Sequence, residues 1–188
     1  MKLYSRKFQQ LLPITLEEAW DFFSSPQNLN KITPTDMKFV ITSKHAKDQK
    51  IYAGMLISYI VSPFKGIKMD WLTEITHVND HVYFIDEQRF GPYAFWHHQH
   101  HFENTKDGVL MTDELTYAIP FGIVGRIANK LIVSKKIDLI FDYRFNKIKE
   151  LFVKKLSTKE YICFLELHLF ALTICQYNFE SQTFLASN

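Results

Sequence analysis

The chain has little cysteine, little glycine and almost no net charge. Its 188 residues include two cysteines, Cys163 and Cys175, both near the C-terminus. A secreted disulfide scaffold needs more cysteines, spread along the chain, so that class is excluded. The net charge of +2 is too small to indicate a nucleic-acid partner. With six glycines and no glycine-rich phosphate loop, we expect no nucleotide or other cofactor.

The composition that remains is that of a globular protein rich in aromatic rings. Hydrophobic residues make up 47% of the chain and charged residues 22%, and there are 17 Phe, 9 Tyr and 3 Trp. Large rings fill wide cores and also line pockets. The stretch from Met1 to Leu12 lacks the apolar run of a secretory signal, which predicts a cytoplasmic protein.

The N-terminal part reads as one strand followed by two short helices. A strand is expected over Lys2–Leu12, ended by Pro13. The Thr15–Glu18 stretch has the pattern of a capping box and predicts a helix to about Ser24. Pro26 is well placed in the first turn of a second short helix.

Six further strand-like segments follow, joined by short turns, so we expect them to form one antiparallel sheet with the first strand. Their expected bounds are Lys38–Ser43, Met55–Val61, Ile67–Val78, His81–Phe90, Phe95–Glu103 and Val109–Ile119.

The hydrophobic period changes after Phe121. Gly122–Val153 contains no proline, and apolar residues recur at helical spacing. This predicts one helix of about 30 residues and about 45 Å. The expected apolar stripe consists of Ile123, Ile127, Leu131, Ile137, Phe141, Phe145, Ile148 and Phe152.

The tail, residues 154–188, differs in kind from the body, residues 1–153. Tyr161–Tyr177 is almost wholly apolar but is interrupted by Glu166 and His168, and it is short for a membrane span. A membrane helix, a surface helix on the body, a dimer contact, an added hairpin and a segment without function all stay open.

Several motifs resemble one known superfamily. Trp20–Pro34 is similar to the opening helices of START/SRPBCC proteins, and Gly91-Pro92-Tyr93 followed by Trp96, His98, His100 and Phe102 is similar to the most recognisable stretch of one branch. Thr112-Asp113-Glu114 and Phe141-Asp142-Tyr143-Arg144 complete the match. That branch is labelled cell-division-inhibitor-like or polyketide-cyclase-like.

The resemblance covers roughly Leu3 to Phe152 and implies an α+β helix-grip fold. In that fold a curved antiparallel sheet of about seven strands wraps around a long C-terminal helix, with two short helices after the first strand. It also implies a cavity for a hydrophobic small molecule between sheet and helix.

Alternation along the strand puts Trp96, His98, His100 and Phe102 on one face and His97, Gln99 and His101 on the other. If the first face points inward, two imidazoles enter the cavity. They would then be structural, or bind the polar end of a ligand, or act as acid and base. We expect no metal, because a zinc site needs three or four ligands and no cysteine or acid clusters with these histidines in the sequence.

Three charged residues, on two segments, are further candidates. Asp113 or Glu114 on the next strand can pair with a histidine across the strands, or with a surface cation. Arg144 in the long helix either holds a carboxylate or phosphate in the cavity, or forms a salt bridge elsewhere.

Three functions stay open. The preferred one is binding of a lipid-like, polyketide-like or aromatic molecule; the others are a cyclase or dehydratase using cavity histidines, and a protein-interaction module with a collapsed cavity. Catalysis is not favoured, since no nucleophile with a matched base is evident. The predicted cavity residues are Trp71, Phe84, Phe90, Tyr93, Trp96, His98, His100, Tyr117, Phe121, Ile127, Leu131 and Arg144.

Overall fold

A computed structural model describes residues 1–44, 46, 49–64 and 67–152. Residues Met1–Lys149 form one compact unit. The expectations for the tail, residues 154–188, lie outside the described residues. Among the described helices, none has both the length and the apolar character needed to cross a membrane.

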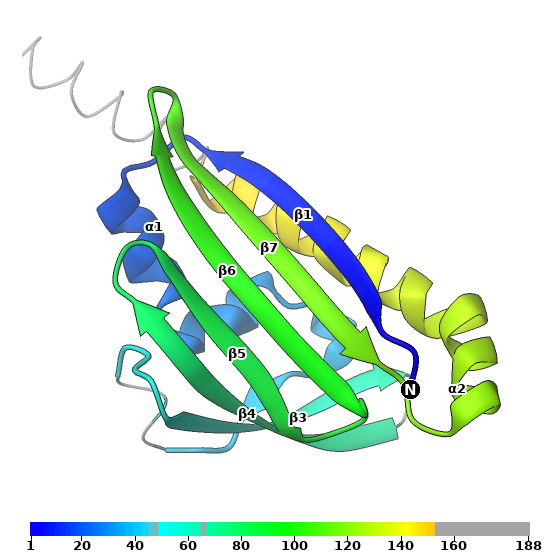
Figure 1. The fold of residues 1–188 in the computed structure, drawn as a ribbon. Helices are drawn as coiled ribbons and strands as arrows, with labels where there is room; N and C mark the ends of the chain where they lie inside the picture. The colour runs from blue at the N-terminus through cyan, green and yellow to red at the C-terminus, as the bar shows by residue number, and fades with distance from the viewer. Residues whose placement is uncertain (45, 47–48, 65–66, 153–188) are drawn as a thin grey trace, which may run out of the picture. The chain divides into compact units, whose positions relative to one another are not determined.

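Seven strands form one antiparallel sheet in the order β1-β7-β6-β5-β4-β3-β2 (Figure 1). Chain neighbours pair throughout, except that β1 closes onto β7. The predicted fold class is therefore confirmed. The strands are β1 (Tyr4–Leu12), β2 (Val40–Ile41), β3 (Met55–Phe64), β4 (Ile67–Asn79), β5 (Tyr83–Phe90), β6 (Phe95–Thr105) and β7 (Gly108–Ala118).

Local chemistry explains the short helices after β1. In α1 (Leu16–Phe23) the Thr15 hydroxyl accepts from the Glu18 amide, and the Glu18 carboxylate accepts from the Thr15 amide, so the predicted capping box is confirmed. The second short helix is the 3-10 helix η1 (Pro26–Ile32), with Pro26 at its start. A further 3-10 turn, η2 (Thr35–Met37), leads into β2.

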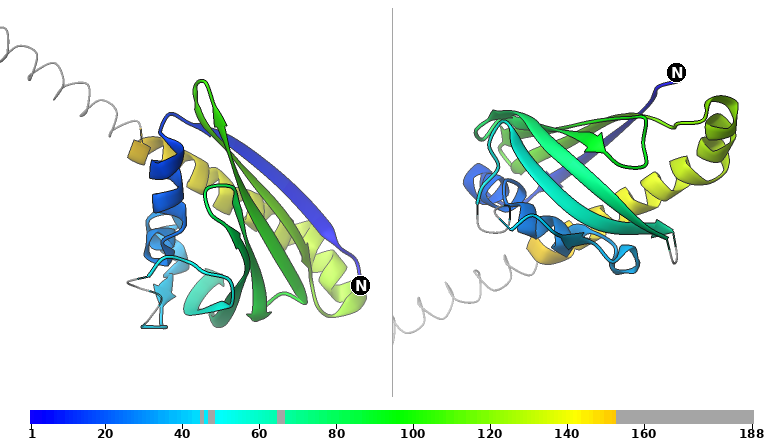
Figure 2. Two further views of the ribbon diagram at one scale, coloured as in Figure 1. Left: turned by 60° about the vertical axis from the view of Figure 1, so that its left-hand side comes forward. Right: turned by 90° about the horizontal axis from the view of Figure 1, so that it is seen from below.

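The long helix crosses one face of the sheet, as the views in Figure 2 show. It consists of α2 (Gly122–Ala128), a π segment η4 (Asn129–Val133) and an α-helical stretch over residues 134–152. Leu115 and Tyr117 of β7 pack against Ile137 and Phe141 of the helix in one buried cluster. The rings of Phe8 and Phe141 stack at 4.0 Å, which fixes β1 to the same helix.

The π segment divides the helix into two halves with different buried faces. Ile137 and Phe141, after the segment, are buried as predicted. Ile127 and Leu131 are 55% and 67% exposed, so their predicted place on the inner face is wrong. A π turn holds an extra residue, which shifts the inward positions before it by one. Ala128, in place of Ile127, lines the cavity between the helix and the sheet.

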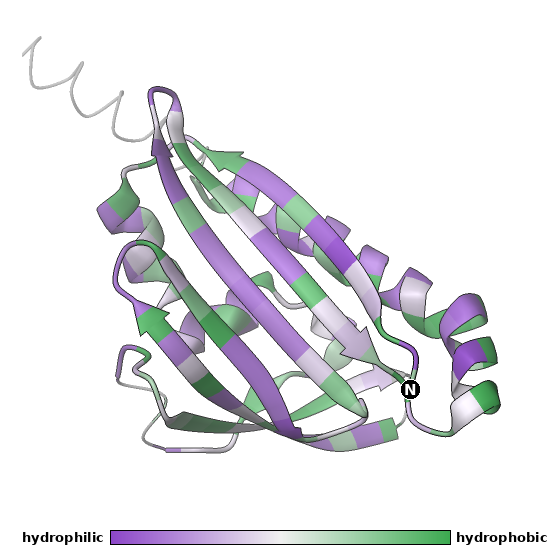
Figure 3. Ribbon diagram, in the orientation of Figure 1, coloured by the Kyte–Doolittle hydropathy of each residue, from purple (hydrophilic) through white to green (hydrophobic). Residues whose placement is uncertain are grey.

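Register shifts bend the sheet. One lies between Val61 and Phe64 in the β3–β4 pair, and two lie in the β4–β5 pair. Each unpaired residue increases the local twist of its strand. The sheet can therefore curve around the helix and leave space between the two. Figure 3 shows that β6 is hydrophilic along most of its length.

The β6–β7 turn supplies a test of the fold. A Cβ on Gly108, whose φ is +126°, would lie 2.1 Å from the Leu12 carbonyl oxygen, while a Cβ on Gly54, at φ +90°, meets nothing within 4 Å. We expect Gly108→Ala to lower the free energy of unfolding by at least about 3 kcal/mol and Gly54→Ala by only about 1–2 kcal/mol. Urea unfolding of both variants measures this, and equal losses would contradict the close approach of β1 to this turn.

Candidate functional site

A cavity of about 420 Å³ lies between the sheet and the helices. Its wall is mostly apolar and aromatic, with contributions from Ile57 and Trp71 on the sheet and Phe141 on the long helix. A space of this size matches the lower range of small-molecule pockets, about 300–1,000 Å³. The cavity therefore has room for one small ligand.

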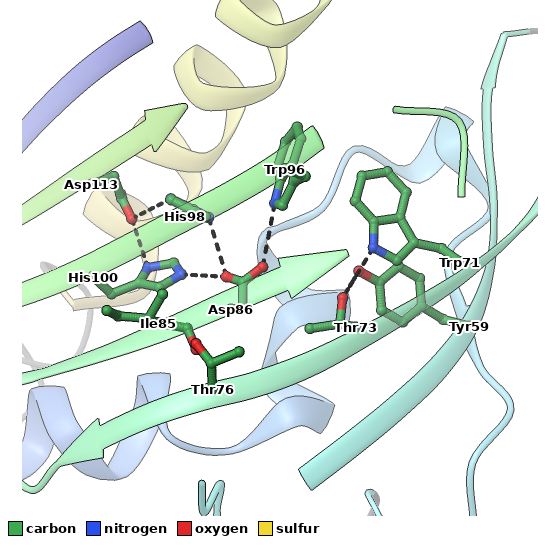
Figure 4. Close-up of polar contacts among 10 residues, drawn as sticks. All are labelled: Tyr59, Trp71, Thr73, Thr76, Ile85, Asp86, Trp96, His98, His100 and Asp113. Atoms are coloured by element: carbon green, nitrogen blue, oxygen red, sulfur yellow. Dashed lines mark hydrogen bonds and ion pairs between the residues drawn. The ribbon is translucent and has the colours of Figure 1, made fainter. Parts of the chain in front are cut away.

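Two histidines and two aspartates form a closed cluster at the sheet side of the cavity (Figure 4). Asp86 Oδ2 lies 3.3 Å from His98 Nδ1 and 2.9 Å from His100 Nε2. Asp113 Oδ1 lies 3.1 Å from His98 Nε2 and 2.7 Å from His100 Nδ1, the latter an ion-pair contact without hydrogen-bond alignment. Each carboxylate thus contacts both rings.

The strand register explains how four residues distant in sequence meet. His98 lies opposite Asp86 of β5, and His100 lies opposite Asp113 of β7. All four side chains therefore stand on the same face of three neighbouring strands. Asp86, His98 and His100 line the cavity, whereas Asp113 is not part of its wall.

Burial and charge act in opposite directions on these groups. Burial alone disfavours the charged form of each aspartate, but hydrogen bonds and charge from the two histidines hold the pKa of Asp86 and that of Asp113 well below the ordinary range. Burial alone would lower the pKa of His98, but hydrogen bonds to Asp113 and Asp86 outweigh it and raise this pKa to about 9. The cluster therefore keeps ionised groups inside an apolar site.

Trp96 and Thr73 hold further polar groups in the cavity wall. The Trp96 indole N–H donates to Asp86 Oδ1 at 3.3 Å, so the second carboxylate oxygen is also engaged. Thr73 Oγ1 accepts from Trp71 Nε1 at 3.0 Å and lies 2.8 Å from the Tyr59 hydroxyl. Burial first, and then the charge of Asp86, raise the pKa of Tyr59. Tyr59 is therefore a neutral hydroxyl in this wall.

Arg144 is a cation in the cavity wall. Its guanidinium lies over the Phe141 ring, 5.0 Å from the ring centroid. Its Nε is buried without a hydrogen-bond partner, and the described part of the chain gives it no ion pair. The alternative of a structural salt bridge thus finds no partner among these residues.

Eight of the twelve predicted cavity residues line the cavity. These are Trp71, Phe84, Tyr93, Trp96, His98, His100, Phe121 and Arg144. Phe121, which is 81% exposed, lies at the rim. Whether any of them contacts a ligand stays a prediction.

Four predicted cavity residues lie elsewhere. Phe90 is 64% exposed, because a register shift between Leu72 and Thr73 leaves Arg89 unpaired and reverses the alternation at the end of β5. Tyr117 is fully buried, and its hydroxyl donates to Asn129 Oδ1 at 3.0 Å instead of facing the cavity. Ile127 and Leu131 are turned outward by the π segment.

Sequence reasoning missed Asp86. The premise that no acid lies with the histidines is wrong, because Asp86 and Asp113 both contact them. A pattern for Asp86 was present: it lies two residues after Phe84 on a predicted strand, and so on the same face. Of the two alternatives left open for these acids, Asp113 follows the first and pairs with a histidine, whereas Glu114 follows the second and pairs with Lys7.

The architecture is a helix-grip fold, the class in which a curved sheet holds a long C-terminal helix. No family model matches the chain, and no curated protein matches it either. Solved structures do, and they are compatible with a Bet v 1-like form of this fold.

Three of these structures illustrate the likeness. The protein TTHA0849 from Thermus thermophilus is 15% identical with a TM-score of 0.59, over 81% of this chain and 99% of that one. Ms6760 from Mycobacterium smegmatis is 13% identical with a TM-score of 0.57, over 82% and 98%. Ara h 8.0201 is 10% identical with a TM-score of 0.55, over 79% and 99%. At these identities the likeness shows the fold alone.

The pKa of His98 leads to a stability prediction. A pKa raised from 6.5 to about 9 on folding stabilises the native state below pH 6.5, and this contribution is lost as the pH rises towards 9. In buffer with a chelator we expect the free energy of unfolding to fall by about 3 kcal/mol over this interval. Urea unfolding across the pH range measures the slope.

The matched control is on the same strand. His98→Gln is expected to remove most of the slope, whereas His97→Gln, which changes the half-buried partner of Glu87 on the opposite face, should retain it. A slope that persists in His98→Gln would show that other groups cause the pH dependence.

Proposed function

We propose that the protein binds one hydrophobic small molecule, lipid-like, polyketide-like or aromatic, in the cavity between sheet and helix. The observation that carries this proposal is an apolar space of about 420 Å³ with a few polar groups in its wall. Burial of ligand carbon there contributes about 25 cal/mol per Å² before the costs of association. The polar groups then set the orientation of the ligand.

The motif resemblance supports the same function. The START/SRPBCC superfamily, to which the motifs are similar, includes carriers of lipids, sterols and polyketides. Within it, the cell-division-inhibitor-like or polyketide-cyclase-like branch is the narrower proposal. A cavity of this size does not favour the alternative of a protein-interaction module with a collapsed cavity.

A cyclase or dehydratase is the second candidate function. The observation that favours it is the pairing of His98, in the cavity wall, with the carboxylates of Asp86 and Asp113. Such a histidine is held charged near neutral pH and can donate a proton to a bound molecule. Chemical conversion of a bound polyketide-like compound, rather than its simple retention, distinguishes this candidate from the first.

Filling the cavity tests the first candidate. Ile57 of β3 is 7% exposed and lines the cavity, so Ile57→Phe places a ring in the space a ligand would occupy. We expect binding of the dye anilinonaphthalene sulfonate, measured by fluorescence titration, to weaken about tenfold, which is about 1.4 kcal/mol.

The control and the thermal stability complete this test. Ile67→Phe adds the same ring at a position that is 52% exposed and outside the cavity wall, and it should bind the dye like the original protein. The melting temperature of Ile57→Phe should be unchanged or higher, because a true void accepts the ring. If Ile57→Phe instead lowers the free energy of unfolding by about 1–3 kcal/mol, the space is already filled by the core.

Arg144 predicts a preference for an anionic head group. A guanidinium without a carboxylate partner in the wall can hold a ligand carboxylate by charge-assisted hydrogen bonds. We expect Arg144→Gln to weaken lauric acid binding about tenfold and to leave dodecanol binding nearly unchanged, as measured by displacement of the dye. An equal loss for both ligands would show that Arg144 acts through packing on Phe141 alone.

A further inference from the structure

The cluster of Asp86, His98 and His100 has features that a pair of ordinary salt bridges does not require. One ligand atom from each residue lies within 4.8 Å of the others. The Asp86 Oδ2 separations, 3.3 Å to His98 Nδ1 and 2.9 Å to His100 Nε2, resemble those between ligands of one metal ion. Bonds of about 2.1 Å at tetrahedral or octahedral angles place neighbouring ligand atoms about 3.0–3.5 Å apart.

We propose that Asp86 Oδ2, His98 Nδ1 and His100 Nε2 bind a divalent transition-metal ion at the wall of the cavity. This site goes beyond the proposed ligand-binding function and does not depend on it. Imidazole nitrogens favour zinc and iron(II) over Mg²⁺ and Ca²⁺, which prefer oxygen ligands.

Asp113 occupies the place of an outer carboxylate. It contacts the other nitrogen of each ring, Nε2 of His98 at 3.1 Å and Nδ1 of His100 at 2.7 Å. A histidine that binds a metal usually directs its second N–H to a carboxylate, which fixes both the tautomer and the ring orientation. Here one carboxylate lies beside the second nitrogen of both rings. With a metal bound, each ring would be neutral and would keep its single proton on the nitrogen nearer Asp113.

The remaining Asp86 oxygen is also held. Trp96 Nε1 donates to Oδ1 at 3.3 Å, which leaves Oδ2 directed to the two histidines. Two carboxylates balance the two charges of the cation, so the filled site is neutral within an apolar surrounding. All three ligand residues line the cavity and Asp113 does not. A bound ion would therefore be reached from the cavity side.

Three protein ligands leave at least one coordination position for water or for a ligand atom. Metal sites with two histidines, one carboxylate and an open position are those that activate a bound molecule, while purely structural zinc sites use four protein ligands. The site is thus of the reactive kind, facing the space proposed for a hydrophobic ligand.

Metal titration of the chelator-treated full chain tests the proposal. We expect calorimetry with Zn²⁺ to give one equivalent bound, and Asp86→Asn to abolish this binding. Asp113→Asn should weaken it about 10–100-fold, the usual effect of losing an outer carboxylate. His97→Gln and His101→Gln, on the opposite face of β6, should bind like the original protein. Stoichiometric binding that survives Asp86→Asn, or that is lost equally in the controls, overturns the proposal.

A second measurement needs no variant. The original protein loaded with Co²⁺ should show paramagnetically shifted NMR signals from two imidazole rings and no thiolate charge-transfer absorption. No bound cobalt, fewer than two shifted rings, or a thiolate band from Cys163 or Cys175 would overturn the site. Dye binding is measured on the metal-free protein and does not depend on any of these outcomes. The metal site can therefore fail while the proposed ligand binding still holds, and the two failures can be told apart.

Discussion

The contact of two carboxylates with the same two imidazole rings is the interaction on which the site depends. Asp86 and Asp113 are mostly buried, and an isolated carboxylate in such surroundings would give up its charge. Contacts to His98 and His100 keep both acids ionised. Because β5, β6 and β7 each contribute to this cluster, it also joins the middle of the sheet. Removing one member would leave a buried charge without compensation.

The cluster and the apolar cavity have complementary effects. The surrounding aromatic rings exclude water and so strengthen each ion pair. The ion pairs in turn let polar groups remain in the wall of an otherwise apolar cavity. Curvature makes both possible, because the register shifts in β3, β4 and β5 let the sheet curve around the helix with space between the two. A flat sheet would place its side chains directly against Phe141 and its neighbours.

Much of the fold was predictable because its patterns are local. Alternation along residues 95–105 correctly placed His98 and His100 on one face, and the pattern at Thr15–Glu18 gave the start of α1. Asp86 was missed because its partners lie on another strand, and the sequence does not display the register between strands. Phe90 and Ile127 were misplaced for a common reason, an inserted residue that breaks a regular period. Phe90 follows such a residue in β5, and Ile127 precedes one in the π segment.

How deeply a side chain is buried was harder to predict than the face of the strand or helix on which it lies. Tyr117 does point to the helix side of β7, but the helix covers it completely, and Asn129 satisfies its hydroxyl. Arg144 shows the opposite case. A place in the cavity and a salt bridge elsewhere were both open for its charge, and it lies on an aromatic ring in the cavity wall. Such differences depend on the distance between the helix and the sheet. The spacing of residues in the sequence does not give this distance.

Because the π segment holds one extra residue, the side chains at the cavity rim can change independently of those on the sheet. Deleting one residue within 129–133 would restore a regular helix and rotate the half before it by about 100° relative to the half after it. The entrance would then present a different set of side chains, while β5, β6 and β7 kept theirs. Deletion of a single codon in this segment can thus change the side chains at the cavity rim without disturbing the polar groups of the sheet.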